Sequence, residues 1–276
     1  MARISLCGGN RVGCDRSLNS QLSTKNSQRC CAAFTLIELL IVVGIIAVLL
    51  VLMAPAFTTM KSGTDVTSAA YTIQGVLDTA RTYAKANDTY TWVGFYEEDV
   101  SQGSMTPAAA GIGRLVVSTV ASKNGTMIYD PTNLGQQNLT TSLVQVGKLT
   151  KIDNIHLWTH TDAPTGLGST FDTRPNVSST YCIGDASPSN STTRFAYPVG
   201  SPAPTAQYTF VKAVEFNPRG EARINNSTTN SSTEVFPLQT AAEVALQPTH
   251  GTTVDSINPV AIQFTGIGGN VRIYRK

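Results

Sequence analysis

Residues 33–61 read AFTLIELLIVVGIIAVLLVLMAPAFTTMK, and this stretch decides the beginning of the fold. From Cys30 to Met60 the only charged side chain is Glu38, and residues 39–60 carry no charge at all. About 20 apolar residues in a helix span the hydrocarbon core of a bilayer, so the stretch predicts a transmembrane helix. A carboxylate in such a helix costs roughly 2.5–3.5 kcal/mol at mid-membrane. Glu38 therefore needs a partner, which an ordinary membrane anchor does not supply.

Charge divides the chain at this helix. Residues 1–33 hold five basic residues and one acid, whereas the remainder holds fifteen basic and seventeen acidic residues. A basic segment before an apolar run stays in the cytoplasm, so the part beyond Met60 is expected outside it. Four of the five cysteines lie in the basic leader, and Cys182 alone cannot form an internal disulfide. Only 14% of the residues are charged, which suits an exported or surface protein.

The first ten residues of the apolar run, FTLIELLIVV at 34–43, resemble the class III signal of type IV prepilins and type II secretion pseudopilins. The resemblance implies that a prepilin peptidase cuts between Ala33 and Phe34, where a small alanine stands in place of the usual glycine. It implies N-methylation of Phe34 and places Glu38 fifth and Pro55 twenty-second in the mature chain, as in that family. In the assembled fibre, Glu38 would meet the Phe34 amine of a neighbouring subunit, because opposite charges attract strongly in a medium of low dielectric constant.

Two other interpretations of the apolar run are weaker. A conventional secretory signal could end at the small residues Ala54, Pro55 and Ala56, but its basic region would exceed thirty residues and Glu38 would interrupt its apolar region. A plain anchor without processing leaves Glu38 unexplained. A lipoprotein is excluded in practice, because no cysteine follows the run closely.

The rest of the chain predicts an α+β fold, in which a long N-terminal helix packs on an antiparallel sheet. Residues 69, 73, 76, 80 and 83 recur at helical spacing and predict a core-facing stripe, so one helix is expected from 34 to 87. Pro55 is expected to bend or locally melt it. The expected divisions are a removed leader (1–33), a transmembrane and assembly helix (34–60) and an extracytoplasmic globular domain (61–276).

Runs rich in β-branched and aromatic residues predict strands, at 89–96, 114–121, 126–129, 142–152, 154–160, 210–216, 221–224, 260–265 and 270–274. The sequence NPRG at 217–220 predicts a tight turn, and residues 239–246 suggest a short helix. Residues 161–207 are rich in proline, serine and threonine, and residues 225–233 are entirely Asn, Ser and Thr. Neither segment can bury much apolar surface, so both are expected to be exposed loops.

Three short segments of the globular part resemble the GspH/FimT-like minor pseudopilins. Residues 76–84, VLDTARTYA, are similar to the L-x-x-A-R-x-x-A segment of their helix. Residues 216–220, FNPRG, resemble their late F-x-P-x-G turn, and residues 269–273, GNVRI, resemble their final strand, which begins with glycine.

Candidate chemistry in the globular part is sparse. His156 and His160 lie about 13 Å apart if they share a strand face, and no third ligand is apparent, so no metal is expected. Residues 97–99, EED, suggest a solvated turn, with calcium binding as the weaker interpretation. No catalytic motif appears, so neither an enzyme nor a cofactor is expected.

The predicted function is structural: a minor pilin or pseudopilin, anchored in the bacterial inner membrane with its globular domain in the periplasm. Its expected partners are prepilin peptidase, other pilin or pseudopilin subunits and membrane lipid, in a type II secretion pseudopilus or a type IV pilus. The alternative is a tip-located binding subunit that contacts DNA or an exported substrate. For that role the candidate residues are Arg272, Arg275 and Lys276, whose three cations alone would bind nucleic acid weakly and in a salt-sensitive way.

Overall fold

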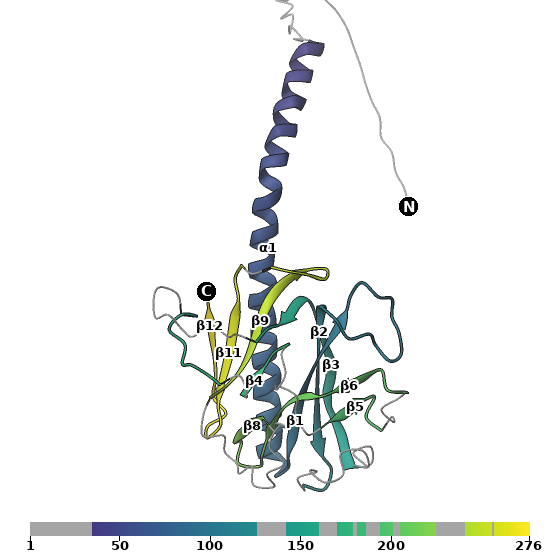
Figure 1. Cartoon of the computed structure of the whole chain (residues 1–276), viewed down its shortest axis with the longest axis vertical. Helices are drawn as coiled ribbons and strands as arrows, with labels where there is room; N and C mark the ends of the chain where they lie inside the picture. The colour runs from purple at the N-terminus through teal and green to yellow at the C-terminus, as the bar shows by residue number, and fades with distance from the viewer. Residues whose placement is uncertain are drawn as a thin grey trace, which may run out of the picture. The chain divides into compact units, whose positions relative to one another are not determined.

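The computed structural model describes residues 35–125, 142–159, 170–178, 181–185, 194–200, 205–224, 241–255 and 257–276, with backbone alone at 54–60, 62 and 241. The chain divides into two compact units, Met1–Val51 and Leu52–Lys276. Helix α1, Leu36–Ala86, passes from the first unit into the second. It remains helical through Pro55, so the local melting expected there does not occur. The strands that follow α1 make an α+β fold, as the sequence predicts (Figure 1).

The described strands of the second unit form one large sheet and a small two-stranded ladder. The large sheet has the order β12-β11-β9-β3-β2-β1-β7-β8, and β10 and β4 also pair with β9. All of these pairs are antiparallel except the short parallel pair of β4 with β9. β5 and β6 pair separately. The strands are β1 (Thr91–Asp99), β2 (Gly113–Ser122), β3 (Leu143–Leu157), β4 (Cys182–Ile183), β5 (Phe195–Tyr197), β6 (Tyr208–Phe210), β7 (Lys212–Phe216), β8 (Ala222–Ile224), β9 (Ala241–His250), β10 (Thr253–Val254), β11 (Val260–Thr265) and β12 (Val271–Arg275).

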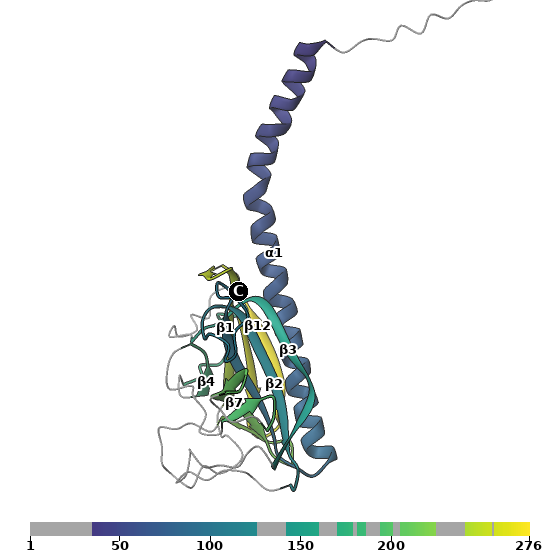
Figure 2. The same ribbon diagram turned by 90° about the vertical axis from the view of Figure 1, so that its right-hand side faces the viewer.

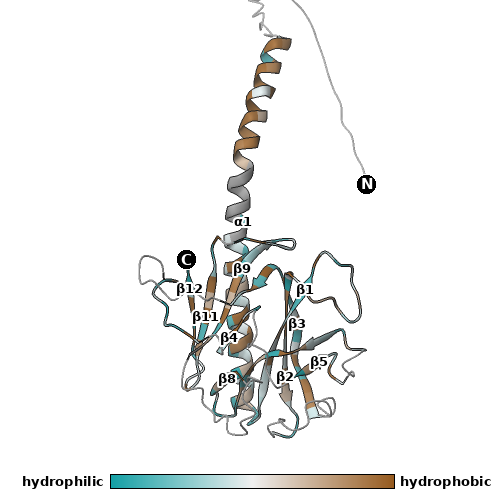
Figure 3. Ribbon diagram, viewed as in Figure 1, coloured by the Kyte–Doolittle hydropathy of each residue, from teal (hydrophilic) through white to brown (hydrophobic). Residues whose placement is uncertain are grey.

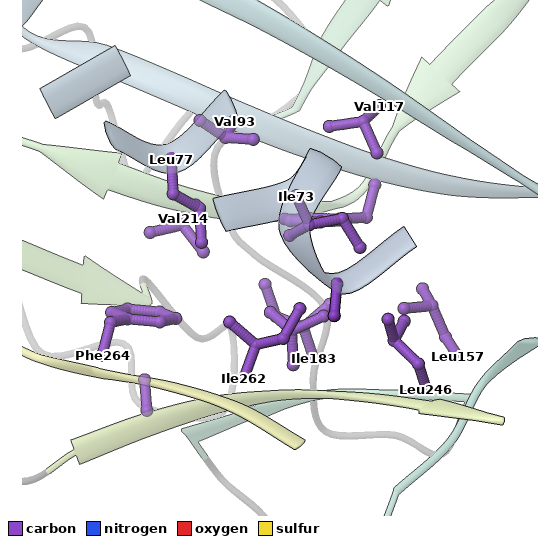
Figure 4. Packing of buried hydrophobic residues seen from close by; sticks show 14 of the residues in the cluster. Ile73, Leu77, Val93, Val117, Leu157, Ile183, Val214, Leu246, Ile262 and Phe264 are labelled. Atoms are coloured by element: carbon purple, nitrogen blue, oxygen red, sulfur yellow. The ribbon is translucent and has the colours of Figure 1, made fainter. Parts of the chain in front are cut away.

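One face of the large sheet packs against the C-terminal half of α1 (Figure 2). Ile73 and Leu77 are fully buried there and lie among side chains from β1, β7 and β11 (Figure 4). The remaining buried helix residues follow the same helical spacing, at Val66, Ala69, Ala70, Ala80 and Ala84. Most of them are alanines, and such small side chains let the helix backbone approach the sheet closely.

The opposite face is covered in part by β5 and β6. Phe195 and Phe210 stack with ring centroids 4.9 Å apart, and they lie directly over Gly94 of β1. A Cβ atom at Gly94 would be 2.7 Å from Cβ of Phe210, so glycine is required at this point of the strand. Trp92 and Tyr208 complete an aromatic core on this face.

The prediction that residues 161–207 form an exposed loop is wrong for its described parts. β4 and β5 belong to this segment, and Phe195 is 2% exposed. Its apolar residues are too widely spaced to show a strand period, but the described ones at Phe171, Cys182, Ile183 and Phe195 are buried against the rest of the globular unit. Residues 126–129 and 225–233, for which the sequence predicts a strand and a loop, lie outside the described residues, as does His160.

Two further sequence expectations are corrected. The short helix predicted at 239–246 is not formed in its described part, 241–246, because β9 occupies this region and its residues 242–249 are buried. A strand buried on both faces shows a continuous apolar run that does not differ from a short buried helix. Residues 142–152 and 154–160, expected as two strands, instead contribute to the single strand β3. Asn154 has a φ of 62° at an irregularity in the register, which explains the apparent break.

The NPRG turn at residues 217–220 joins β7 to β8, as the sequence predicts. Its geometry is set by Asn217, whose side-chain oxygen accepts hydrogen bonds from the backbone N–H groups of Arg219 and Glu221 at 3.0 and 2.9 Å. The backbone N–H of Ala222 donates to the carbonyl of Gly266 at 2.8 Å. This bond brings β8, at one end of the strand order, to the turn between β11 and β12 at the other end.

Candidate functional site

The first turn of α1 holds Glu38 by hydrogen bonds within the chain. Carboxylate oxygen Oε2 of Glu38 accepts from the backbone N–H and from the hydroxyl of Thr35, both at 2.9 Å. The N–H of Glu38 in turn donates to the Thr35 hydroxyl at 3.3 Å. This is a capping box, in which Thr35 and the glutamate three residues later satisfy each other's backbone donors. The T-x-x-E signature is visible in the sequence, and it indicates Thr35 as a local partner of Glu38. The charge of Glu38 by itself does not indicate this partner.

The helix that follows this cap is apolar on all sides. The span Leu36–Met53 has a mean hydropathy of 3.2, and it is the one helix among the described residues that is long and apolar enough to cross a membrane. Its large side chains are exposed, from 46% at Val42 to 81% at Leu36. Figure 3 colours most of this part of the α1 ribbon brown, the colour of hydrophobic residues. A surface of this kind requires lipid or protein around it, and the span fits a single-pass membrane anchor.

Comparison with known proteins identifies this segment. Residues 28–54 match the family described as the prokaryotic N-terminal methylation motif. The chain therefore carries a prepilin-type motif. The match includes Ala33, Phe34 and Glu38, and it supports the pilin and pseudopilin class. It leaves the globular unit uncovered, and neither a curated protein nor a solved structure matches the chain.

The predicted processing and assembly residues differ in what the structure says of them. Ala33 and Phe34 lie outside the described residues, and Pro55 is described by its helical backbone alone. Glu38 is described with its side chain, which forms the capping box with Thr35.

The three short segments that resemble GspH/FimT-like proteins meet in space. Arg81, from the helix segment, donates through Nε to the carbonyl of Gly220 in the turn segment at 3.3 Å. A Cβ atom at Gly269, which begins the last segment, would lie 2.7 Å from that carbonyl oxygen and 2.9 Å from Cδ of Arg81. Both glycines have positive φ, at 79° and 60°. The arginine and the two glycines therefore form one packing point, which joins α1 to two turns of the sheet.

The acidic run at residues 97–99 belongs to β1 and is not a solvated turn. Glu98 is 8% exposed, and its Oε2 accepts from Arg114 and from the Tyr208 hydroxyl, both at 3.2 Å. Lys151 lies 3.6 Å from the same oxygen. The sequence could not show this burial, because the cover comes from β6, more than a hundred residues later. The carboxylate thus ties β6 to the sheet.

Glu97 bridges a gap between strands. β3 pairs with β2 as far as Ile155 and then pairs with β9, so the strands separate. The Glu97 carboxylate accepts from the backbone N–H of Leu157 at 2.8 Å and lies 2.7 Å from Nδ1 of His156. The sequence does not predict this contact, because His156 and the acidic run at 97–99 lie far apart along the chain.

A cleft of about 440 Å³ opens at this gap, lined in part by Glu97, His156, Asp185 and Lys212. Nε2 of His156 lies 3.7 Å from Asp185, and the Lys212 ammonium donates to the carbonyl of Gly184. Burial lowers the pKa of Lys212, although Glu97 and Asp185 oppose the shift. Among the residues that the structure describes, no group of histidine, cysteine and acidic side chains is arranged to hold a metal ion. The polar groups of the cleft bind one another, which indicates a structural role.

A buried ion pair fixes residues 170–178 to the sheet face opposite α1. Nε of Arg174 lies 3.3 Å from Oε2 of Glu243, and Gln263 donates to the same oxygen at 2.8 Å. Burial raises the pKa of Glu243, although the bonds from Gln263 and Arg174 counteract it. Cys182 is buried nearby, and burial together with the charge of Glu243 raises its pKa to about 12, so the thiol is inert at neutral pH.

The three cations considered for nucleic-acid binding do not share one face. Side chains alternate along a strand, so Arg275 shares a face with Val271 and Ile273, which pack against the helix-side core. Its guanidinium carbon lies 5.1 Å from the centroid of the Tyr71 ring on α1. Arg272 lies on the other face of β12 and is exposed. The structure therefore does not assemble these residues into one basic surface.

Proposed function

We propose that this chain is a minor pilin or pseudopilin subunit of a type IV pilus or a type II secretion pseudopilus. The observation that carries the proposal is the match of residues 28–54 to the N-terminal methylation motif, with Glu38 at the fifth position after the Ala33–Phe34 bond. The apolar span Leu36–Met53 and the packing of the later half of α1 on a sheet support it. The motif indicates a structural subunit rather than an enzyme.

In the proposed pathway the basic leader stays in the cytoplasm and the globular unit lies in the periplasm. Prepilin peptidase cuts after Ala33 and methylates the new amine of Phe34, which keeps its positive charge. Before assembly, the Glu38 carboxylate accepts hydrogen bonds from the backbone N–H and the hydroxyl of Thr35. During assembly, its carboxylate pairs with the Phe34 amine of a neighbouring subunit and sets the axial register. Such a pair is strongly favoured once formed, because removing either charge would strand the other in an apolar medium.

Processing is tested by producing the full chain with a prepilin peptidase and determining its N-terminus by mass spectrometry. The expected product begins at Phe34 and carries one added methyl group. Ala33→Gly should leave the site of cutting unchanged, whereas Ala33→Glu should block it, because the peptidase accepts a small residue there. A mature chain that begins at another residue would contradict the proposed processing.

The charge of Glu38 is tested by incorporation into the filament. Glu38→Gln keeps an oxygen that can accept from Thr35, but it cannot form an ion pair with an amine. We expect Glu38→Gln to insert into the membrane and to be lost from sheared filaments. Thr35→Ser retains the capping hydroxyl and serves as the matched control, with normal incorporation. Wild-type incorporation of Glu38→Gln would overturn the proposed pairing.

A further inference from the structure

Strand β10 and the connection from β10 to β11 carry two exposed apolar side chains. Ile257 is 53% exposed and Val254 is 36% exposed. The turn is ordered by Asp255, whose backbone N–H donates to the Pro248 carbonyl at 2.9 Å and whose carboxylate accepts from the Ile257 N–H at 3.0 Å. These apolar side chains therefore sit on a defined turn.

The β10–β11 connection lies against α1 at Gly63. The side-chain nitrogen of Asn258 lies 3.5 Å from the position that a Cβ atom would take at Gly63. Gly63 follows Lys61, which is the first charged residue after the uncharged run at 39–60. A helix rises about 1.5 Å per residue, so Gly63 is about 3 Å beyond Lys61 along the helix axis.

The position of Lys61 sets the depth of the β10–β11 connection in the membrane. A lysine at the end of a membrane-spanning run places its ammonium at the interface between lipid and water. The Ile257 turn, which lies against Gly63, is therefore at the same level. Isolated exposed apolar residues are common on soluble proteins, but here their level coincides with the edge of the apolar run.

The basic end of the chain lies beside the same turn. The backbone N–H of Lys276 donates to the carbonyl of Pro259 at 3.4 Å, two residues after Ile257. Lys276 is exposed, as is Lys61. Cations at the level of the headgroups attract acidic phospholipids by about 1 kcal/mol each.

We propose that β10 and the β10–β11 connection form a membrane-contact site, in which Ile257 and Val254 enter the lipid surface and Lys276 faces acidic headgroups. The proposal rests on the membrane anchorage in the proposed function, with the uncharged run of α1 up to Met60 in the bilayer. It gives the basic C-terminal end a lipid partner in place of nucleic acid. Extraction of the subunit into a filament breaks this contact.

Tryptophan substitution in the full chain tests this site. Ile257→Trp and Ile267→Trp are placed in the chain, which is reconstituted in phosphatidylcholine vesicles with brominated acyl chains. Ile267 is the matched control, because it is also exposed, at 71%, but it lies past the other end of β11. The native Trp92 and Trp158 are common to both variants, and the unsubstituted chain supplies their baseline. Ile257→Trp is expected to lose emission to the bromines and to shift to the blue, and Ile267→Trp to do neither.

The outcomes separate this proposal from the anchorage on which it rests. A chain that does not float with the vesicles would contradict the anchorage. A chain that floats, with equal emission from Ile257→Trp and Ile267→Trp, would overturn the contact site alone. Replacing part of the lipid by phosphatidylglycerol should increase quenching at position 257, and Lys276→Gln should reduce that increase. Quenching that is insensitive to acidic lipid would remove Lys276 from the site.

Discussion

The two halves of helix α1 differ in where their apolar side chains find partners. In Leu36–Met53 every large apolar side chain is exposed, whereas Ile73 and Leu77 in the later half are fully buried against the sheet. The first half is apolar all round, which leaves no polar face for water. The second half has an apolar stripe and a polar opposite face. One continuous helix is therefore built for two environments, an external apolar one and the chain's own core.

This difference predicts that the two halves tolerate substitutions differently. A buried side chain is held by neighbours that only partly relax when it is removed, so its loss is felt as a cavity. A side chain that faces lipid or another subunit has no such neighbours within its own chain. Stability of the globular unit and assembly of the subunit should therefore respond to separate sets of helix residues.

The largest expected effect comes from two matched leucines. Leu77→Ala should lower the free energy of unfolding of the globular unit by about 2–5 kcal/mol, because it removes a fully buried side chain. Leu49→Ala changes a side chain that is 53% exposed in the apolar half and should leave that free energy unchanged. Urea unfolding of the full chain in detergent micelles, followed by the emission of the buried Trp92, measures both. Equal destabilisation by the two variants would break the distinction between the halves.

A smaller effect is expected where the later half of α1 meets the turns of the sheet. Gly269→Ala should destabilise the globular unit by about 1–3 kcal/mol, because it forces alanine to a φ of 60° and brings a Cβ atom within 2.7 Å of the Gly220 carbonyl oxygen. Gly103→Ala is the control, since a Cβ atom there would meet nothing within 4 Å. The same urea titration compares them, and a neutral Gly269→Ala would show that Arg81 and the turn can move apart freely.

The sequence predicted features that have a local period or a local motif. The positions Ala69, Ile73 and Ala80 of the α1 stripe, the NPRG turn and strand β11 follow from spacing and turn chemistry, and β11 has the bounds that the sequence predicts at 260–265. The predicted stripe positions Val76 and Tyr83 are only half-buried, and Leu77 and Ala84 beside them are buried instead. The T-x-x-E cap is also a local motif, although the charge of Glu38 by itself does not indicate it.

Features that depend on distant segments could not be predicted in this way. Glu98 is buried by Tyr208, and Glu97 accepts from Leu157, so the environment of both acids is set by strands far along the chain. Residues 239–246 have helical composition, but the described ones, 241–246, belong to β9 in the interior of the sheet, and tertiary pairing overrode the local preference. The prepilin motif is the opposite case, since its chemistry lies in a short contiguous segment that a sequence comparison recognises by itself.

The smallest expected effect compares two glycines of the same helix. A Cβ atom at Gly75 or at Gly44 would meet nothing within 4 Å, so neither substitution causes a clash inside the chain. Gly75→Ala should stabilise the globular unit by about 0.5–1 kcal/mol, because alanine loses less conformational freedom than glycine in a helix. Gly44→Ala should not change the unfolding of that unit, but it adds a methyl group to the surface proposed to pack against neighbouring subunits. Urea titration and filament incorporation are measured on both variants. Gly75→Ala should change only the unfolding of the globular unit, and Gly44→Ala only the incorporation. A shift in unfolding caused by Gly44→Ala would mean that the two halves of α1 are energetically coupled.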